Sequence, residues 1–461
     1  MTLQRANRLK SLVRIACAVV MVTLAQGCAQ NKPKPGEIFL MPAPGVYEEG
    51  RIDPFIDNDP ISRGLQPGIL YATDRAKAAP DDKHFKYYNY DRAGMVYLGV
   101  ADVRVGHDES ITWEEARRIS LLKNRTENYP LAVADVREFG VLESTVSPTD
   151  DVTERSPEPG RRFFAEIDQR LAVSKTRDVY IYVHGYKVNF ENPILVASEL
   201  WHFLGYNGAF IAYSWPTKPS TFAYFADLDN AINSARYLRT LILEIAKNTR
   251  VNRIHVIGYS AGTRLVGRML ADLGMYGYLL GDDEVDRRVK LGNVILIGSD
   301  IDQDILTGYL FDGALRIPEA FTIYVSQADN ALKWSNRVFR GHARVGQLLD
   351  RRELNAREKA FFEEHPEIRI IDVTNAEGST TGNGHGYFRS SPWVSSDVLM
   401  TLMYNLKPRE RGLVREDDWP VWDFPPDYVE RLRESLVKVN PALRSEPPPA
   451  SSGDDASGDS R

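Results

Sequence analysis

Short apolar runs alternate along this chain with segments in which apolar residues recur every three or four positions. An uninterrupted apolar run is typical of a strand buried on both faces, whereas the longer spacing predicts a helix. We predict strands at residues 69–72, 95–105, 179–183, 210–213, 253–257, 294–297, 321–325 and 368–373, the second of them antiparallel. Residues 231–246 have the helical spacing, with one apolar stripe formed by Ile232, Ala235, Leu238, Leu241, Ile242 and Ile245.

Strands that alternate with helices predict an α/β fold with a mostly parallel central sheet flanked by helices. Parallel neighbours need a long crossover connection, and helices supply it. In open sheets of this kind, binding sites lie at the carboxyl ends of the strands. The residues that directly follow predicted strands are therefore the first candidates for chemistry.

Composition and charge narrow the function classes. The 461 residues are 43% hydrophobic and 26% charged, and the formal net charge is −6, so we expect a globular protein without a nucleic-acid partner. We find no histidine–cysteine spacing for zinc, no phosphate-binding glycine loop and no strand-linked dinucleotide fingerprint. We therefore expect no metal and no cofactor.

The N-terminus has the features of an export signal. Residues 1–27 carry four basic and no acidic residues, and an apolar stretch at 11–24 is short for a membrane span. Residues 24–28 resemble a bacterial lipobox ending in Cys28, although Ala25 stands where leucine is usual. Cleavage there would leave Cys28 as the mature chain's only cysteine, and lipidation would consume its thiol. An ordinary secretory signal and an uncleaved anchor are the alternatives.

These features predict a lipid-anchored protein of the cell envelope. Removing residues 1–27 takes the formal net charge from −6 to −10, so acyl chains rather than charge would hold the protein at an anionic membrane. Ala29 is not aspartate, which by resemblance to lipoprotein sorting favours the outer membrane, on the side facing the periplasm. We predict a signal peptide at 1–27, a flexible tether at 28–45, one catalytic domain with an N-terminal extension at 46–440, and a disordered tail at 441–461.

The sequence Gly258-Tyr259-Ser260-Ala261-Gly262 lies between a predicted strand and a segment of helical spacing. Strand, Gly-x-Ser-x-Gly and helix together are typical of a nucleophile elbow, a turn so sharp that the serine hydroxyl stands clear of the sheet. The flanking glycines leave space where a Cβ atom would collide with the neighbouring backbone. The pattern predicts that Ser260 is a nucleophile.

A serine hydroxyl needs a base within hydrogen-bond reach, and the base needs a carboxylate to orient it. Of the eight histidines, His385 is our candidate base, because it lies in a glycine-flanked loop after the last predicted strand. Asp329 follows the preceding strand and gives the order Ser, Asp, His. Asp300 and Asp302 compete for the same role, with helix N-capping as their other interpretation.

The developing oxyanion needs two backbone donors. We expect one from the Ala261 N–H at the elbow and the other from the Tyr186 N–H, in the sequence His184-Gly185-Tyr186 that follows the strand at 179–183. His184 would then support the loop rather than act as a second base. We interpret His255, inside a predicted strand, as a core residue.

In combination these motifs resemble those of the bacterial α/β-hydrolases of unknown function. The resemblance runs from about Gly68 to Met403. It rests on residues 72–75, 183–186, 213–216, 258–263, 299–302, 325–329 and 384–388. It implies the α/β-hydrolase fold and a triad of Ser260, Asp329 and His385, but no substrate. The tether, the acidic tail and the stretch between Val105 and Arg162 depart from the family.

The predicted function is a serine hydrolase that acts through an acyl-enzyme on carboxyl esters, either lipids or small esters, with thioesters or amides as alternatives. The gap at 298–320 has room for little more than one helix, so we expect no deep lid there. The alternative to an enzyme is a non-catalytic envelope lipoprotein that uses the fold for binding or scaffolding.

Overall fold

The computed structural model describes residues 37–56, 58–65, 67–122, 124–148, 155–218, 224–278, 280–333, 344–347, 356–417 and 419–443. The predicted signal peptide, Cys28 and the tail from residue 444 lie outside these ranges. By its contacts the chain divides into two units, Met1–Ile38 and Phe39–Arg461.

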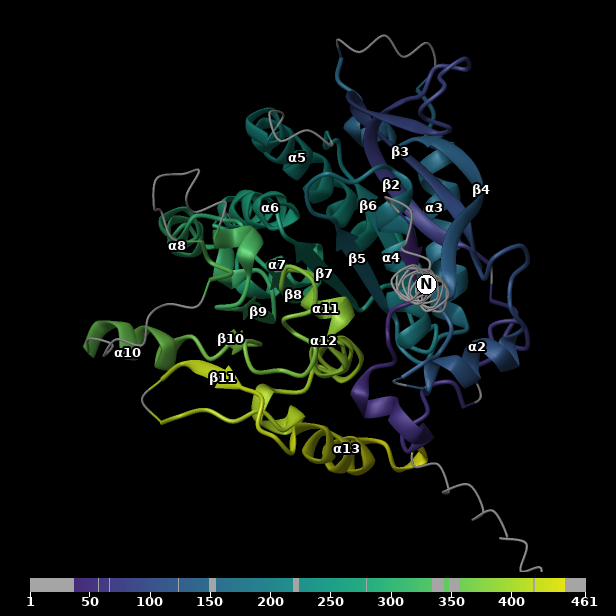
Figure 1. The fold of residues 1–461 in the computed structure, drawn as a ribbon. Coiled ribbons are helices and arrows are strands. Elements are labelled where there is room, and N and C mark those ends of the chain that lie inside the picture. Colours follow the sequence, from purple (N-terminus) through teal and green to yellow (C-terminus); the bar gives the residue numbers. More distant parts are fainter. Residues whose placement is uncertain are drawn as a thin grey trace, which may run out of the picture. The chain divides into compact units, whose positions relative to one another are not determined.

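The second unit contains a mixed sheet in the order β4-β3-β2-β6-β5-β7-β8-β9-β10-β11 (Figure 1). β2 pairs antiparallel with β3, and β3 with β4, whereas every pair from β2 to β11 is parallel. The strands are β2 (Ile69–Lys77), β3 (Tyr88–Val105), β4 (Pro130–Val141), β5 (Asp178–Val183), β6 (Ala209–Ser214), β7 (Arg253–Tyr259), β8 (Leu291–Ile297), β9 (Ala320–Val325), β10 (Ile368–Asp372) and β11 (Val421–Asp423). This confirms the mostly parallel sheet and the antiparallel second strand.

Sequence analysis missed β4 and β11. β4 is mostly half-exposed or exposed, so its residues form no continuous apolar run. β11 has only three residues and adds at the end of the parallel series beside β10. A two-residue strand, β1 (Ile38–Phe39), spans the boundary between the two units along the chain.

Helices cover both faces of the sheet. On β5, Ile181 and its neighbours two residues away belong to a core cluster with side chains of α3, α5 and α6, while Tyr182 contacts Phe388 of α11 on the other face. The predicted stripe of α5 is buried except for Ile232, which is 57% exposed. The helices are α2 (Trp113–Ser120), α3 (Glu158–Ala172), α4 (Glu191–Phe203), α5 (Tyr224–Asn248), α6 (Gly262–Gly277), α7 (Asp282–Val289), α8 (Gln303–Phe311), α10 (Ala356–Glu364), α11 (Tyr387–Ser390), α12 (Pro392–Tyr404) and α13 (Tyr428–Val439).

Shorter 3₁₀ helices connect these elements: η1 (Gly45–Gly50), η2 (Glu143–Thr145), η4 (Ala314–Arg316), η5 (Pro408–Arg411) and η6 (Pro441–Leu443). Between β8 and β9 the chain forms α8 and η4, in keeping with the short connection expected there. No helix within the described residues is both long and apolar enough to cross a membrane.

The packed body extends beyond both predicted boundaries. Leu40, Met41 and Ala43 fall in the predicted tether, yet all three are buried, and the Met41 N–H donates to Glu199 Oε2 (3.1 Å). The proline-rich composition suggested a tether, but Leu40, Met41 and Ala43 are apolar, and burying them stabilises this segment against the rest of the protein. At the other end, η6 occupies the first residues of the predicted tail, and its Leu443 is buried.

A buried ion pair holds η5 against α12. Arg411 donates to both carboxylate oxygens of Asp397, at 2.7 and 3.0 Å, and both side chains are fully buried. Asp397 also accepts hydrogen bonds from the hydroxyls of Tyr324 and Tyr428. A buried charge pair with its remaining lone pairs satisfied in this way fixes one arrangement of β9, α12, η5 and α13.

Candidate active site

Ser260 occupies a strained turn between β7 and α6. Its φ is 54°, a left-handed conformation that a non-glycine residue adopts at a cost. A Cβ atom on Gly262 would lie 2.2 Å from the carbonyl oxygen of His184, and one on Gly258 would lie 3.0 Å from a methyl group of Val266. The two glycines therefore let the turn pass between the helix and the loop after β5, as the sequence predicts for an elbow.

The structure brings Ser260, His385 and Asp329 together. His385 Nε2 lies 2.8 Å from Ser260 Oγ, and its Nδ1 lies 2.6 Å from Asp329 Oδ2. With Asp329 as a carboxylate, Nδ1–H donates to it, and Nε2 is left as an acceptor for the serine hydroxyl. Asp329 is fully buried, and its other oxygen accepts from the Leu332 N–H (3.0 Å). The imidazole is thus fixed in the tautomer that a general base requires.

Neither competing aspartate reaches the imidazole. Asp302 is the N-cap of α8 and accepts hydrogen bonds from the backbone N–H groups of the first helical turn. Asp300 lies 3.2 Å from Arg264 Nε and 3.8 Å from Arg344 Nε. N-capping was the other interpretation of these two residues, and it holds for Asp302.

Two loops carry the histidine and the aspartate side by side. The Asn330 N–H donates to the Asn383 carbonyl (3.1 Å), and the backbone of Gly384, with φ 67°, passes so close to Ala328 that a Cβ would lie 2.7 Å from its carbonyl oxygen. The Tyr387 hydroxyl accepts from the Gly298 N–H (2.7 Å). The same hydroxyl donates to a β9 carbonyl (3.0 Å). Sequence analysis missed this role for Tyr387, although its position beside the candidate base was a signal.

The loop after β5 lies against the serine. A Cβ on Gly185 would lie 2.7 Å from Ser260 Cβ. His184 Nε2 accepts from the Trp215 N–H (3.1 Å), so its proton is on Nδ1, which donates to the Gly185 carbonyl (2.7 Å). That carbonyl and the Tyr186 N–H belong to one planar trans peptide and point in opposite directions. Holding the carbonyl therefore also fixes the direction of the Tyr186 N–H.

The other expected donor lies at the elbow itself. Ser260 N–H is occupied by the Ile297 carbonyl (2.9 Å). The N–H of Ala261, the N-cap of α6, donates to no other described residue. A backbone donor beside the hydroxyl, at the positive end of a helix dipole, suits a negatively charged oxygen.

Arg75 holds the end of this loop in place, a role that sequence analysis did not assign to it, although residues 72–75 were part of the family resemblance. It is fully buried and donates to Ser214 Oγ (2.9 Å) and to the Val188 carbonyl (3.0 Å). Burial lowers its pKa to about 10. Arg75 thereby ties β2 and β6 to the end of the loop that contains Gly185. The signal was an arginine inside an apolar strand, which needs partners to be buried.

His184, His255 and three aromatic residues near strand ends are structural. Burial, with the charge of Arg75 adding to it, lowers the pKa of His184 well below its usual value, so His184 is a neutral support as expected. His255 is buried and stacks on Tyr180, which confirms it as a core residue. Among the aromatics near strand ends, Phe190, Tyr213 and Trp215 are buried in the core. No group of three or more His, Cys, Asp or Glu able to hold a metal ion occurs within the described part of the chain.

Residues 162–403 match the model of a protein family described as "Alpha/beta hydrolase of unknown function (DUF900)". No curated protein matches the chain. Among solved structures, esterase 2 of Thermogutta terrifontis is 14% identical with a TM-score of 0.27, over 50% of this chain and 81% of its own. Esterase B from Lactobacillus rhamnosis is 11% identical with a TM-score of 0.26, over 57% of this chain and 78% of its own. At these scores neither likeness bears on substrate.

The buried titratable groups predict that acid destabilises the protein. Burial lowers the pKa of His184, and it lowers that of His202 and of His255 to about 3, so below about pH 6.5 the unfolded chain binds protons that the folded chain does not. Asp74 opposes them, because burial raises its pKa to about 6 and the folded state gains its proton first. Burial also raises the pKa of Asp178, Glu191 and Asp227, whereas the hydrogen bond from Arg118 lowers that of Glu115 to about 2. The histidines titrate in the unfolded chain over the whole of this range, so the free energy of unfolding should fall as the pH is lowered from about 6 to 4. Urea denaturation across this range measures it, and a constant free energy would contradict the assignment.

Proposed function

Since the chain belongs to the alpha/beta hydrolases of unknown function, we propose that it is a serine hydrolase that cleaves carboxyl esters through an acyl-enzyme. One observation carries the proposal: His385 bridges Ser260 and Asp329, with its two ring nitrogens 2.8 and 2.6 Å from their oxygens. A hydroxyl, an imidazole and a buried carboxylate in this order form a nucleophile with its base and the group that orients the base.

In the proposed first step, Ser260 Oγ attacks the ester carbonyl carbon while His385 Nε2 takes the hydroxyl proton. Asp329 stabilises the imidazolium that forms. The carbonyl oxygen becomes an anion, for which the N–H groups of Ala261 and Tyr186 are the donors we propose. Collapse of the tetrahedral intermediate breaks the bond to the alcohol oxygen, which leaves with the proton from His385. The acyl group stays on Ser260.

In the second step, water replaces the alcohol. His385 takes a proton from the water molecule as its oxygen attacks the acyl carbon, and returns it to Ser260 Oγ as the acid leaves. A thioester or an amide would follow the same path. We favour the ester over the amide because an alcohol leaves the tetrahedral intermediate more readily than an amine does. A lipid or a small ester fits this chemistry equally well.

Labelling by a fluorophosphonate probe tests the nucleophile. We expect the wild-type protein to be labelled and to hydrolyse short p-nitrophenyl esters. Ser260→Ala should lose the label, because it removes the only hydroxyl that His385 contacts among the described residues. Asp329→Asn should lower kcat by about 10⁴-fold, as in other triads whose imidazole loses its orienting carboxylate. Ser62→Ala, in an exposed turn, is the matched control.

The proposal would be contradicted if the correctly folded wild-type protein neither reacted with the probe nor hydrolysed esters. That result would favour the alternative of a non-catalytic envelope lipoprotein that uses the hydrolase fold for binding or scaffolding. Labelling that persists in Ser260→Ala would assign the reaction to another nucleophile.

Gly185→Ala tests the oxyanion donors. Its new methyl would meet Ser260 Cβ at 2.7 Å, so the loop with the Tyr186 N–H must move away. Removing one such donor typically costs 10²- to 10³-fold in kcat, so we expect a loss of roughly that size with KM little changed. Gly281→Ala is a suitable control, because no atom lies within 4 Å of the added methyl there. Unchanged kcat in Gly185→Ala would remove Tyr186 from the mechanism.

We further propose that the protein is held in the cell envelope by acyl chains on Cys28, in the outer membrane facing the periplasm. The support is sequence alone: four basic residues, an apolar stretch and the lipobox-like residues 24–28. One acyl chain binds a membrane only marginally, so the anchor requires more than one.

Fractionation of cells tests the anchor. Cys28→Ala should move the protein to the soluble fraction or leave it unprocessed, because no thiol remains to be acylated. Cys17→Ala lies inside the predicted signal peptide and should leave the mature protein at the membrane. Processing and membrane retention that are the same in Cys28→Ala as in wild type would contradict lipidation.

A further inference from the structure

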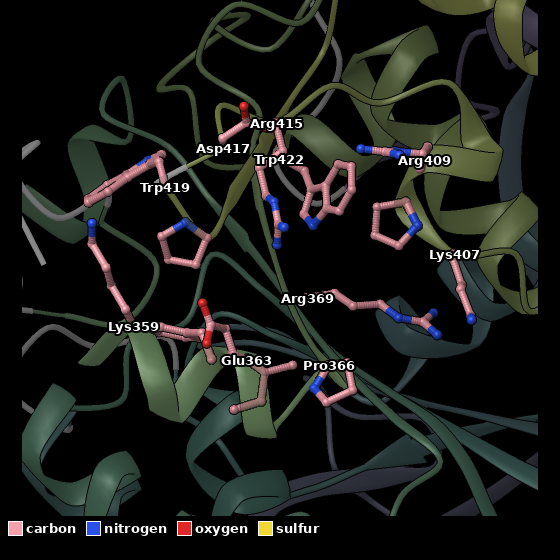
Figure 2. A pocket seen from close by; sticks show the side chains of 14 residues that line it. Lys359, Glu363, Pro366, Arg369, Lys407, Arg409, Arg415, Asp417, Trp419 and Trp422 are labelled. Atoms are coloured by element: carbon pink, nitrogen blue, oxygen red, sulfur yellow. The ribbon is translucent and has the colours of Figure 1, made fainter. Parts of the chain in front are cut away.

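A cavity of about 540 Å³ lies at the amino end of β10. Residues of α10, β10, η5 and β11, with the segment before β11, line it (Figure 2). Strands β7 to β10 are parallel, so this cavity and Ser260 lie at opposite ends of the strands. It shares no residue with the candidate active site.

Positive charge dominates the lining. Five basic residues contribute to it, against two acidic ones. The basic residues are Lys359, Arg369, Lys407, Arg409 and Arg415, and the acidic ones are Glu363 and Asp417. In Figure 2 they surround the cavity from several elements rather than forming a row along one helix. An arrangement of this kind suits an anion held from several directions.

Arg369 is the most informative of these residues. Its side chain lines the cavity, yet the residue is only 7% exposed, and its Nη1 is buried without a hydrogen-bond partner. No ion pair joins its guanidinium to a carboxylate among the described residues. Burial and the nearby charge of Arg411 lower its pKa to about 10. Burying an arginine without an anion beside it costs free energy, so an anion bound next to Arg369 would stabilise its charge.

The neighbouring Arg411 shows how a buried arginine is paired with a carboxylate in this protein. Arg411 is fully buried as well, but it holds Asp397 through two hydrogen bonds. The hydroxyls of Tyr324 and Tyr428 occupy the same carboxylate. Asp397 is therefore hydrogen-bonded to three other side chains, and it acts on Arg369 only through its charge. Among the described residues no carboxylate forms an ion pair with Arg369, which leaves room for an anion bound in the cavity.

The rest of the lining is apolar, and part of it also lines a second cavity. Trp422 packs under the Arg415 guanidinium, whose central carbon lies 5.0 Å from the ring centre. A second cavity of about 190 Å³ shares Phe362, Trp419 and Pro420 with the first. Its other lining is mainly aliphatic, from α8, β9, β10 and β11. A cationic cavity and an apolar cavity that share lining residues fit a ligand with an anionic group and an apolar chain.

We propose that the two cavities form one binding site for a phosphorylated amphiphile, with its phosphate on Arg369 and its apolar chain between α8 and β10. Phosphate suits the planar fork of arginine, and its charge matches the excess of cations better than a single carboxylate does. A phospholipid and a soluble alkyl phosphate both combine a phosphate group with an apolar chain.

Calorimetric titration of the purified protein with hexyl phosphate tests the site. Wild type should bind hexyl phosphate more tightly than methyl phosphate or hexanoate, because only the first has both halves. Arg369→Gln should weaken binding of hexyl phosphate by roughly 10- to 100-fold, the size of one charge-assisted contact. Arg161→Gln, which removes the same charge from the exposed face of α3, should change it by less than about twofold.

The unfolding temperature in phosphate-free buffer separates a ligand-binding arginine from a structural one. Arg369→Gln should unfold no earlier than wild type, because it removes an unpaired buried charge. Hexyl phosphate should raise the unfolding temperature of wild type but not of the variant. A variant that unfolds earlier but binds hexyl phosphate as wild type does would overturn the proposal.

Two further measurements test the apolar cavity and identify the source of the ligand. Thr307→Trp, at an exposed position that lines the second cavity, should abolish the preference for hexyl over methyl phosphate. Binding to phosphatidylcholine vesicles that depends on added phosphatidic acid and on Arg369 would assign the site to a phospholipid. Binding of hexyl phosphate without that dependence would assign it to a soluble phosphate ester. Equal affinity for methyl and hexyl phosphate, or no binding of either, would refute the proposal.

Discussion

The close approach of two backbone segments, the turn at Ser260 and the loop after β5, is the constraint on which the site depends. Gly262 and Gly185 stand at the two points of contact, where added Cβ atoms would lie 2.2 Å from His184 O and 2.7 Å from Ser260 Cβ. The His184 carbonyl is held in turn by the indole N–H of Trp215 (2.7 Å). Ser260 and the loop are therefore positioned against each other by the main chain.

Around this contact, each charged or polar group has its direction fixed by a neighbour. His184 is neutral because it is buried beside Arg75, and a neutral ring can both accept from Trp215 and donate to Gly185. A charged ring would have two donors and would lose the first of these hydrogen bonds. Arg75 thus contributes to the geometry of the loop through its effect on the protonation of His184, in addition to its own hydrogen bonds to the chain.

Much of the fold could be predicted from the sequence, because buried parallel strands are written as continuous apolar runs. β4 could not, because half of its surface faces solvent and its pattern is mixed. For the site, the order and local setting of Ser260, Asp329 and His385 sufficed to select residues that the structure brings within hydrogen-bond distance. Arg75 and Tyr387 belong to motifs of the family resemblance, but their roles were not predicted, because these roles depend on partners more than 80 residues away in some cases and the motifs do not identify those partners. The same holds for Arg369, whose missing partner becomes evident only in three dimensions.

The single hydroxyl of Tyr387 links the ends of β8 and β9 to the loop that carries the base, through the Gly298 N–H and the Tyr324 carbonyl. Ser260 stands between a central strand and a helix packed in the core, whereas His385 sits in a loop that such contacts attach to the sheet. Mild heating would therefore release the loop while the sheet stays intact. Heating would then first break the contact between His385 and Ser260, in a local and reversible event below the temperature at which the domain unfolds.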